Sequence, residues 1–156
     1  MEHGPLVGNP LPHFETQDEE GKLRTPQNLM GKNGLLLVFV YGTWCAPCVQ
    51  TIYSVGRTAQ AYLNEGVNVA IVAVDDAPTL KNFKLTSPTP INYPLLADPE
   101  EELHKLYDSA IAKTYLIVDP EGIVRAKFVN ADGKSKPSHQ ALMGAVEEHL
   151  LGQIAQ

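Results

Sequence analysis

The chain has 156 residues with a formal net charge of −6, and its 12 Lys and Arg residues are scattered among 18 Asp and Glu residues. Nucleic-acid binding depends on clustered basic side chains, so this balance argues against a nucleic-acid partner. With 44% hydrophobic and 19% charged residues, the composition is typical of a globular protein rather than a disordered or fibrous one. The length predicts a single domain over residues 1–156.

The apolar segments are too short for a membrane protein. The longest, residues 35–41, falls far below the roughly 20 residues that a spanning helix needs. No basic segment followed by an apolar one stands at the start, so the chain as given is expected to be soluble, with no membrane insertion. The compartment stays open on these observations.

The first half of the chain predicts a strand, a tight turn and a helix after a short lead-in. Residues 7–32 alternate apolar and turn residues, which predicts a small hairpin or an irregular segment. The apolar run 35–41 predicts a central strand buried on both faces, and it ends close to the cysteines. Apolar residues then recur at mostly helical spacing up to Leu63, with Gly66 as the C-terminal cap. Residues 67–74 predict a second buried strand, parallel to the first.

The second half predicts two short helices, a hairpin and a final helix. Asp76 and Asp98 are each followed closely by proline, which favours helix starts there. The predicted strands 115–118 and 123–129 are joined by a tight-turn sequence and should pair antiparallel, and an amphipathic helix begins near Ser138. The order predicts an α/β protein with a mixed central sheet flanked by helices. It also predicts a hairpin-like N-terminal extension and an extra helix inserted before the last β-hairpin.

Cys45 and Cys48 are the only cysteines, so the chain can hold one local dithiol but no framework of structural disulfides. Because the thiolate is the form that attacks a disulfide, a reactive cysteine needs exposure and a setting that favours the anion. The N-terminus of the predicted helix provides both for Cys45, since the first-turn N–H groups lack partners and the helix dipole is positive there. Cys48 lies one turn further in and should be shielded. We therefore expect Cys45 to attack and form a mixed disulfide, and Cys48 to resolve it.

This chemistry implies protein thiols and disulfides as partners, together with an upstream dithiol reductant that restores the pair. It needs no cofactor. A zinc site would need two more ligands, and the sequence has no second cysteine pair and no close histidine pair, so no metal is expected. A purely structural disulfide across so short a loop would constrain the unfolded chain little, which favours a redox role.

Three neighbours of the cysteines are candidates for substrate binding or for tuning the dithiol. Pro47 suits the first helical turn and stiffens the loop between the two sulfurs, and helix initiation alone also explains it. Trp44, the only tryptophan, either offers a flat apolar platform to a partner chain or packs against the end of the sheet. Ala46 completes the segment Trp44-Cys45-Ala46-Pro47-Cys48.

This segment, within residues 40–48, resembles the active-site stretch of thioredoxin-like redoxins of the AhpC/TSA and TlpA/ResA type. Weaker likenesses follow in the family's order at residues 7–14, 72–75, 93–98 and 114–122. The resemblance implies a thioredoxin fold and a thiol-disulfide oxidoreductase acting outside the cytoplasm, in a periplasmic or membrane-tethered bacterial setting. Strong oxidants of this kind carry a histidine between the cysteines; Ala46-Pro47 lacks it, which favours a reductase.

Lys113 and Thr114 mark a departure from the family pattern. Such redoxins carry a cis-proline that faces the dithiol and binds substrate backbone, and Lys113 stands in its place, directly before Thr114. A non-proline cis bond is costly, so we expect a trans bond and a different mode of peptide recognition. Lys113 either places a cation near the thiolate or is solvated.

Two further departures concern acid–base assistance to Cys48. Phe39 stands where thioredoxins carry a buried acid, and Thr51 replaces a glutamate that many extracytoplasmic members carry. Another group must then take the proton of the resolving thiol. The acidic candidates, which the sequence does not rank, are Glu15, Asp75 and Asp76.

Two alternative functions fit parts of the sequence. A peroxiredoxin-like peroxidase would use Cys48 as its peroxidatic cysteine and Lys113 in place of the family's arginine, but Cys45 stands where that site needs threonine or serine, and Tyr41 where it needs proline. A Cu(I)-binding module would use both thiolates, since soft sulfur ligands select Cu(I), with His139 as a third ligand.

Overall fold

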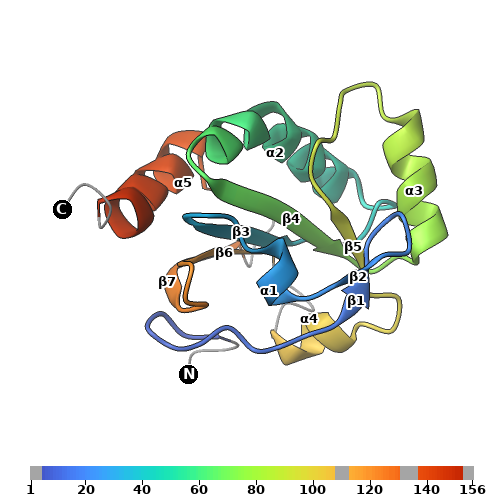
Figure 1. Cartoon of the computed structure of the whole chain (residues 1–156). Coiled ribbons are helices and arrows are strands. Elements are labelled where there is room, and N and C mark those ends of the chain that lie inside the picture. The colour runs from blue at the N-terminus through green and yellow to red at the C-terminus, as the bar shows by residue number, and fades with distance from the viewer. Residues whose placement is uncertain (1–4, 108–112, 131–136, 153–156) are drawn as a thin grey trace.

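The computed structural model describes residues 5–107, 113–130 and 137–152, and its centre is a mixed β-sheet (Figure 1). Within these residues the sheet has five strands, in the order β5-β4-β3-β6-β7. The strands are β3 (Gly34–Phe39), β4 (Val67–Ala73), β5 (Leu95–Ala97), β6 (Lys113–Val118) and β7 (Val124–Asn130). Strands β3, β4 and β5 run parallel, whereas β6 pairs antiparallel with both β3 and β7.

Strand β3 lies in the middle of the sheet and is buried along its whole length. Leu36 and Val38 point into the apolar cluster on one face, and Leu37 and Phe39 into the cluster on the other. This two-sided burial explains the continuous apolar run in the sequence, because neither face of the strand reaches water.

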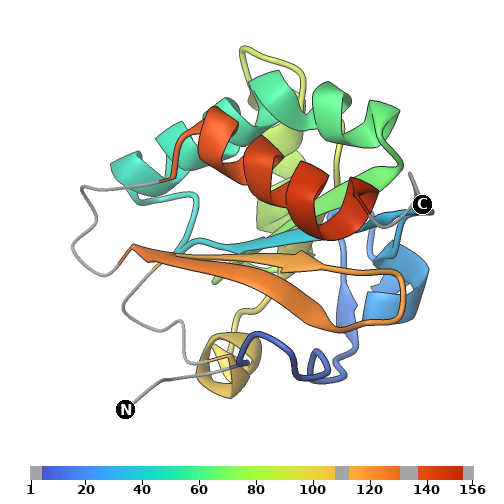
Figure 2. The ribbon, with the colours of Figure 1, turned by 90° about the vertical axis from the view of Figure 1, so that its left-hand side faces the viewer.

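Helices cover both faces of the sheet (Figures 1 and 2). Helix α2 (Ala46–Asn64) and helix α5 (His139–Val146), which a π-helical turn (Glu147–Leu151) extends, lie on one face. Helix α3 (Ala77–Thr86) lies beside β5 and buries Leu80 in the cluster of the same face. The short helices α1 (Pro26–Leu29) and α4 (Glu102–Leu106) lie on the opposite face.

The predicted elements are confirmed in kind and order, with shifts of a few residues at their ends. The predicted lead-in hairpin is formed by β1 (Thr16–Gln17) and β2 (Leu23–Arg24), and the inserted helix before the last hairpin is α4. Gly66 ends α2 with a positive φ of 76°, a conformation that favours glycine. The Asp76 carboxylate caps α3 by accepting a hydrogen bond from the Thr79 N–H at 2.9 Å.

Two short elements were not predicted. Strand β5 follows Pro94 and has three residues, which are too few to show a periodic pattern in the sequence. Its pairing with β4 defines it as a strand. Helix α1 begins at a capping box in which Thr25 and Asn28 satisfy each other's backbone N–H groups. No helix in the described part of the chain is both long and apolar enough to cross a membrane.

Candidate active site

Cys45 lies at the point where the chain passes from the sheet into α2. It is the N-cap residue of that helix, with extended backbone, and its carbonyl accepts the hydrogen bond of the Val49 N–H at 3.0 Å. Its side chain is partly exposed and makes no capping hydrogen bond. The sulfur therefore sits at the positive end of a 19-residue helix and within reach of a partner.

Cys48 lies one turn further along and is only 1% exposed. The two Sγ atoms are 2.7 Å apart. Burial raises the pKa of the Cys48 thiol, and the contact with Cys45 raises it further, while backbone N–H groups of Gly42 and Tyr41 act against this rise. The Tyr41 N–H reaches the Cys48 sulfur at 3.3 Å. The structure thus brings the two predicted cysteines together and makes them unequal.

Two exposed aromatic rings flank the dithiol. Trp44 is 62% exposed and Tyr41 44%, and their rings meet edge to face with centroids 4.7 Å apart. A Cβ atom at Gly42 would collide with the Trp44 indole, so glycine is needed for this packing. Trp44 therefore contacts the loop rather than the end of the sheet, and it remains open to a partner. This position of Tyr41 beside the dithiol was not predicted from the sequence.

Asp75 holds the loop before Cys45. Its Oδ2 accepts hydrogen bonds from the Thr43 backbone N–H at 2.9 Å and from the Thr43 hydroxyl at 3.1 Å. Of the three acidic candidates, Asp75 is the one that contacts the loop next to the cysteines: Asp76 caps α3, and Glu15 is an exposed side chain 3.6 Å from His13. These contacts give Asp75 the role of a loop anchor.

Lys113 reaches the first turn of α2 from β6. Its ammonium donates a hydrogen bond to the Pro47 carbonyl at 3.0 Å, and the same carbonyl accepts from the Thr51 hydroxyl at 3.1 Å. Lys113 is thus bound to the segment between the cysteines. Thr114 is buried at the register position opposite Phe39. The bond before Lys113 involves residue 112, outside the described residues, so the expected trans bond stays a prediction.

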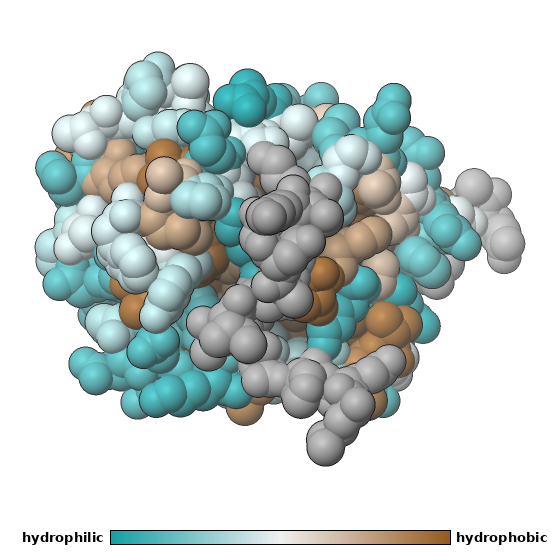
Figure 3. Space-filling model, turned by 180° about the vertical axis from the view of Figure 1, so that it is seen from behind, coloured by the Kyte–Doolittle hydropathy of each residue, from teal (hydrophilic) through white to brown (hydrophobic). Residues whose placement is uncertain are grey.

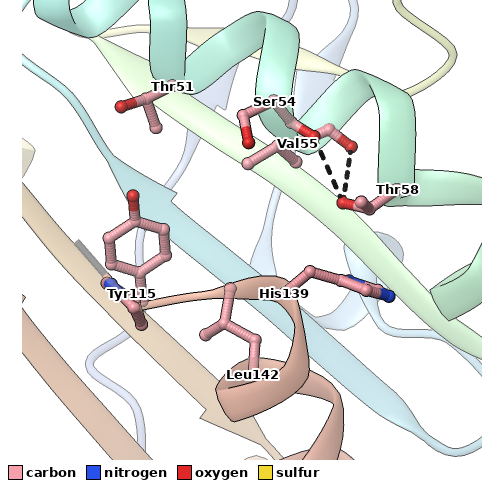
Figure 4. Close-up of a pocket in the computed structure, with 8 residues that line it drawn as sticks. Thr51, Ser54, Val55, Thr58, Tyr115, His139 and Leu142 are labelled. Carbon is pink, nitrogen blue, oxygen red and sulfur yellow. Dashed lines mark hydrogen bonds between the residues drawn. The ribbon is translucent and has the colours of Figure 1, made fainter.

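A small cavity lies between α2, β6 and the start of α5 (Figure 4). Thr51 from α2 and Tyr115 from β6 point toward one another across it, and His139 lies at the start of α5. Burial raises the pKa of Tyr115, a hydrogen bond with Thr51 lowers it, and the proximity of Cys48 raises it. Tyr115 was not singled out in the sequence, although the strand's alternation could have placed it on the face that α2 covers.

Metal ligation finds no support in the geometry. Within the described ranges, no group of three or more His, Cys, Asp or Glu side chains is placed to hold a metal ion. The proposed third copper ligand, His139, has its Nδ1 3.3 Å from the Tyr62 hydroxyl and packs edge to face on that ring. Phe39, at the position of the family's buried acid, faces the other side of the sheet and stacks on Tyr107 with centroids 4.8 Å apart.

Known proteins resemble this chain in sequence and in fold. The chain is 29% identical over 118 residues to the thiol-disulfide oxidoreductase ResA of Bacillus subtilis, a match that covers 75% of this chain and 64% of that protein. A crystal structure of Enterococcus faecalis AhpC superposes with a TM-score of 0.82 at 16% identity, covering 97% of each chain. A putative thiol:disulfide interchange protein DsbE from Chlorobium tepidum superposes with a TM-score of 0.71 at 23% identity, covering 92% of this chain and 99% of that one.

The structural matches bear out the predicted thioredoxin-like fold, and the sequence match agrees with the predicted class of thiol-disulfide oxidoreductase. The model of the AhpC/TSA family matches residues 7–127, which include both cysteines and Lys113. The redoxin resemblance carried by the segment around Cys45 and Cys48 is therefore confirmed. The chain belongs to the AhpC/TSA family.

Proposed function

We propose that this protein is a thiol-disulfide oxidoreductase that reduces disulfides in protein substrates through Cys45 and Cys48. The observation that carries the proposal is the inequality of two adjacent sulfurs, 2.7 Å apart. Cys45 is partly exposed at a helix N-terminus, whereas Cys48 is buried and its pKa is raised. Attack from the accessible sulfur and resolution by the shielded one follow from this difference.

The reaction takes two exchanges. The Cys45 thiolate attacks one sulfur of the substrate disulfide, so a Cys45–substrate bond forms and the other substrate sulfur leaves as a thiolate. Cys48 then loses its proton to water and attacks Cys45, which forms the Cys45–Cys48 disulfide and releases the second substrate thiolate. Two electrons have passed to the substrate. An upstream dithiol returns the protein to its reduced form by the same steps in reverse.

The surroundings of Cys45 suit a protein substrate. Trp44 and Tyr41 offer an exposed aromatic platform beside it, and Lys113 places a cation on the Pro47 carbonyl. The view from behind in Figure 3 shows more than one apolar area on that face of the molecule. Recognition is assigned to the two rings because they lie next to the dithiol, with substrate backbone and apolar side chains lying against them.

The same observations count against the two alternative functions, a peroxidase and a copper-binding module. A peroxidase would need peroxide to reach Cys48, which is 1% exposed and has a raised pKa. The AhpC match at 16% identity speaks for the fold alone. A copper module would need His139 near the dithiol, but that ring packs on Tyr62.

We infer an extracytoplasmic setting from the resemblance to ResA-type redoxins, and fractionation of the native host with antibody detection tests it.

Trapping of the mixed disulfide tests the order of attack. Cys48→Ser removes the resolving thiol, so this variant should accumulate a covalent adduct with a disulfide substrate such as insulin, seen by mass spectrometry under non-reducing conditions. Cys45→Ser should form little adduct, because the remaining thiol is buried. Adduct formation by Cys45→Ser alone would reverse the roles, and the absence of turnover and adduct in all forms would refute the proposed function.

The reduction potential tests the direction. Equilibration in glutathione or dithiothreitol buffers can be followed by the fluorescence of Trp44, the single tryptophan. A reduction potential of about −270 mV would support a reductant, and one of about −120 mV would make the protein a disulfide donor.

A further inference from the structure

A buried histidine–carboxylate pair lies next to the end of β3, and the proposed reaction does not use it. His104, on α4, is 0% exposed. Its Nδ1 lies 2.7 Å from Asp98 Oδ2, and its Nε2 lies 2.7 Å from the Val40 carbonyl oxygen. Asp98 also accepts hydrogen bonds from the backbone N–H groups of Leu103 and His104.

The partners of each group indicate which atoms donate and which accept. A carbonyl oxygen only accepts, so Nε2 of His104 carries a hydrogen. Burial raises the pKa of Asp98, but the hydrogen bonds from the His104 ring and the two backbone N–H groups outweigh it, so the pKa lies below its usual value and the carboxylate is ionised. Nδ1 faces this carboxylate, so each nitrogen of the His104 ring lies at hydrogen-bond distance from an acceptor. The Phe39 ring packs edge to face against the His104 ring, with ring centroids 5.3 Å apart, and it also stacks on Tyr107.

One peptide group connects this pair to the dithiol. The Val40 carbonyl that accepts from His104 belongs to the same peptide unit as the Tyr41 N–H that reaches the Cys48 sulfur at 3.3 Å. A hydrogen bond to a peptide carbonyl polarises the unit and strengthens its N–H as a donor. The Nε2–H of His104 on one side of the peptide thus improves the hydrogen bond that the Tyr41 N–H on the other side donates to the thiolate of Cys48.

We propose that His104, oriented by Asp98, is a positioning residue that fixes and polarises the peptide between Val40 and Tyr41, and so stabilises the Cys48 thiolate during resolution. The pair lies beside Phe39, at the position where related redoxins carry a buried acid. This inference deepens the proposed function and rests on it only in taking Cys48 as the resolving thiol. A pair that merely held α4 against the sheet would leave the acidity of Cys48 unchanged.

The test measures that acidity directly. In a Cys45→Ala background, the single remaining cysteine is labelled with ¹³C at Cβ, and its pKa is read by NMR titration. Tyr115, whose pKa the nearby Cys48 raises, and Lys113, which binds the Pro47 carbonyl, are left intact. His104→Met removes both ring nitrogens, and His104→Gln keeps one neutral donor for the Val40 carbonyl. The matched control is Tyr107→Phe, which removes a buried hydroxyl that donates to the Pro12 carbonyl on the same face of the sheet.

We expect His104→Met to raise the Cys48 pKa by about half a unit, which is roughly threefold less thiolate at a given pH. His104→Gln should raise it by less, and Tyr107→Phe should leave it unchanged. Equal values in both His104 variants and in Tyr107→Phe would overturn the inference. His104→Gln supplies the comparison where His104→Met fails to fold. Because no substrate enters this measurement, its result is independent of the reaction that the protein performs.

Discussion

At the scale of single residues, neighbouring carboxylates near the dithiol differ in what they hold. Asp75 binds the backbone and hydroxyl of Thr43 in the loop before Cys45, whereas Asp76 caps α3 with its side chain in solvent. The sequence places both after the second strand and cannot separate them. The difference arises because the loop 41–45 lies against the residues that follow β4, where the Tyr41 carbonyl accepts a hydrogen bond from the Val74 N–H at 2.8 Å, and only the tertiary structure brings these segments together.

This difference predicts the outcome of a matched pair of substitutions. Asp75→Ala removes two charge-assisted hydrogen bonds from the redox loop, so we expect kcat/KM for insulin reduction to fall by about tenfold, in proportion to the loss of about 1.4 kcal/mol of positioning energy. Asp76→Ala should leave this rate unchanged and lower only thermal stability. Equal rates in the two variants would show that the loop keeps its geometry without Asp75.

The lowered pKa of Asp98 predicts an acid-sensitive contribution to stability. Because the folded pKa lies below the unfolded one, the contribution is complete above the ordinary value of about 3.9 and is lost as pH falls through that value toward the folded pKa. The difference between wild type and Asp98→Asn in urea-derived free energy of unfolding should therefore be larger at about pH 5 than at about pH 2.5. Glu121→Gln, at an exposed carboxylate, serves as the control, and its free energy of unfolding should differ from that of the wild type by the same amount at both pH values. A pH-independent difference for Asp98→Asn would contradict the prediction.

At the scale of elements, the sequence predicted best where one segment carries its own signal. The run 35–41 and the caps at Gly66 and Asp76 are local features, and the structure places them as expected. Strand β5 carries no such signal, because three residues show no period and only pairing with β4 defines them.

The candidate site divides along the same line. Both cysteines and their segment could be predicted, since the motif is continuous in sequence. His104 could not, because α4 has one turn and too few residues for its buried side to appear as a periodic pattern. Asp98, predicted only as a helix start, keeps that role and also orients the His104 ring. Contacts between distant segments, here across 64 residues from His104 to Val40, leave no pattern in a single sequence.

Helix α5 offers a test at this scale, since it packs on the α2 face of the sheet through Leu142 and Val146. Its N-cap, Ser138, accepts a hydrogen bond from the Ala141 N–H at 3.0 Å. Ser138→Ala should cost about 1 kcal/mol and lower Tm by about 3 °C, measured by circular dichroism. Ser138→Asp retains an acceptor and adds a charge that suits a helix N-terminus, so it should hold Tm near that of the wild type. A Tm for Ser138→Ala equal to that of the wild type would mean that the cap contributes nothing to the helix.

At the scale of the whole molecule, the sheet has an apolar cluster on each face, and β3 contributes to both. The cluster on the α2 face contains Cys48, and the other contains Phe39, against which His104 packs. The redox loop follows the end of β3, which, like its neighbours β4 and β6, packs side chains into both clusters. A disturbance of either cluster is therefore expected to reach the loop through β3.

Two core substitutions on adjacent residues of β3 test whether these layers unfold together, and with them the prediction of a single domain over residues 1–156. Leu36→Ala opens a cavity on the α2 face and Leu37→Ala one on the opposite face, and each should cost about 2–5 kcal/mol. Leu23→Ala, at a residue that is 56% exposed, should cost less than about 0.5 kcal/mol.

Two probes then follow unfolding in urea. Trp44 fluorescence reports on the redox loop, and far-ultraviolet circular dichroism reports on the whole backbone. In a cooperative unit, the two probes give coincident urea transitions in every variant. Separation of the two transitions in Leu37→Ala but not in Leu36→Ala would mean that the layer carrying α4 can unfold alone, so that the redox loop could survive the loss of the His104–Asp98 pair.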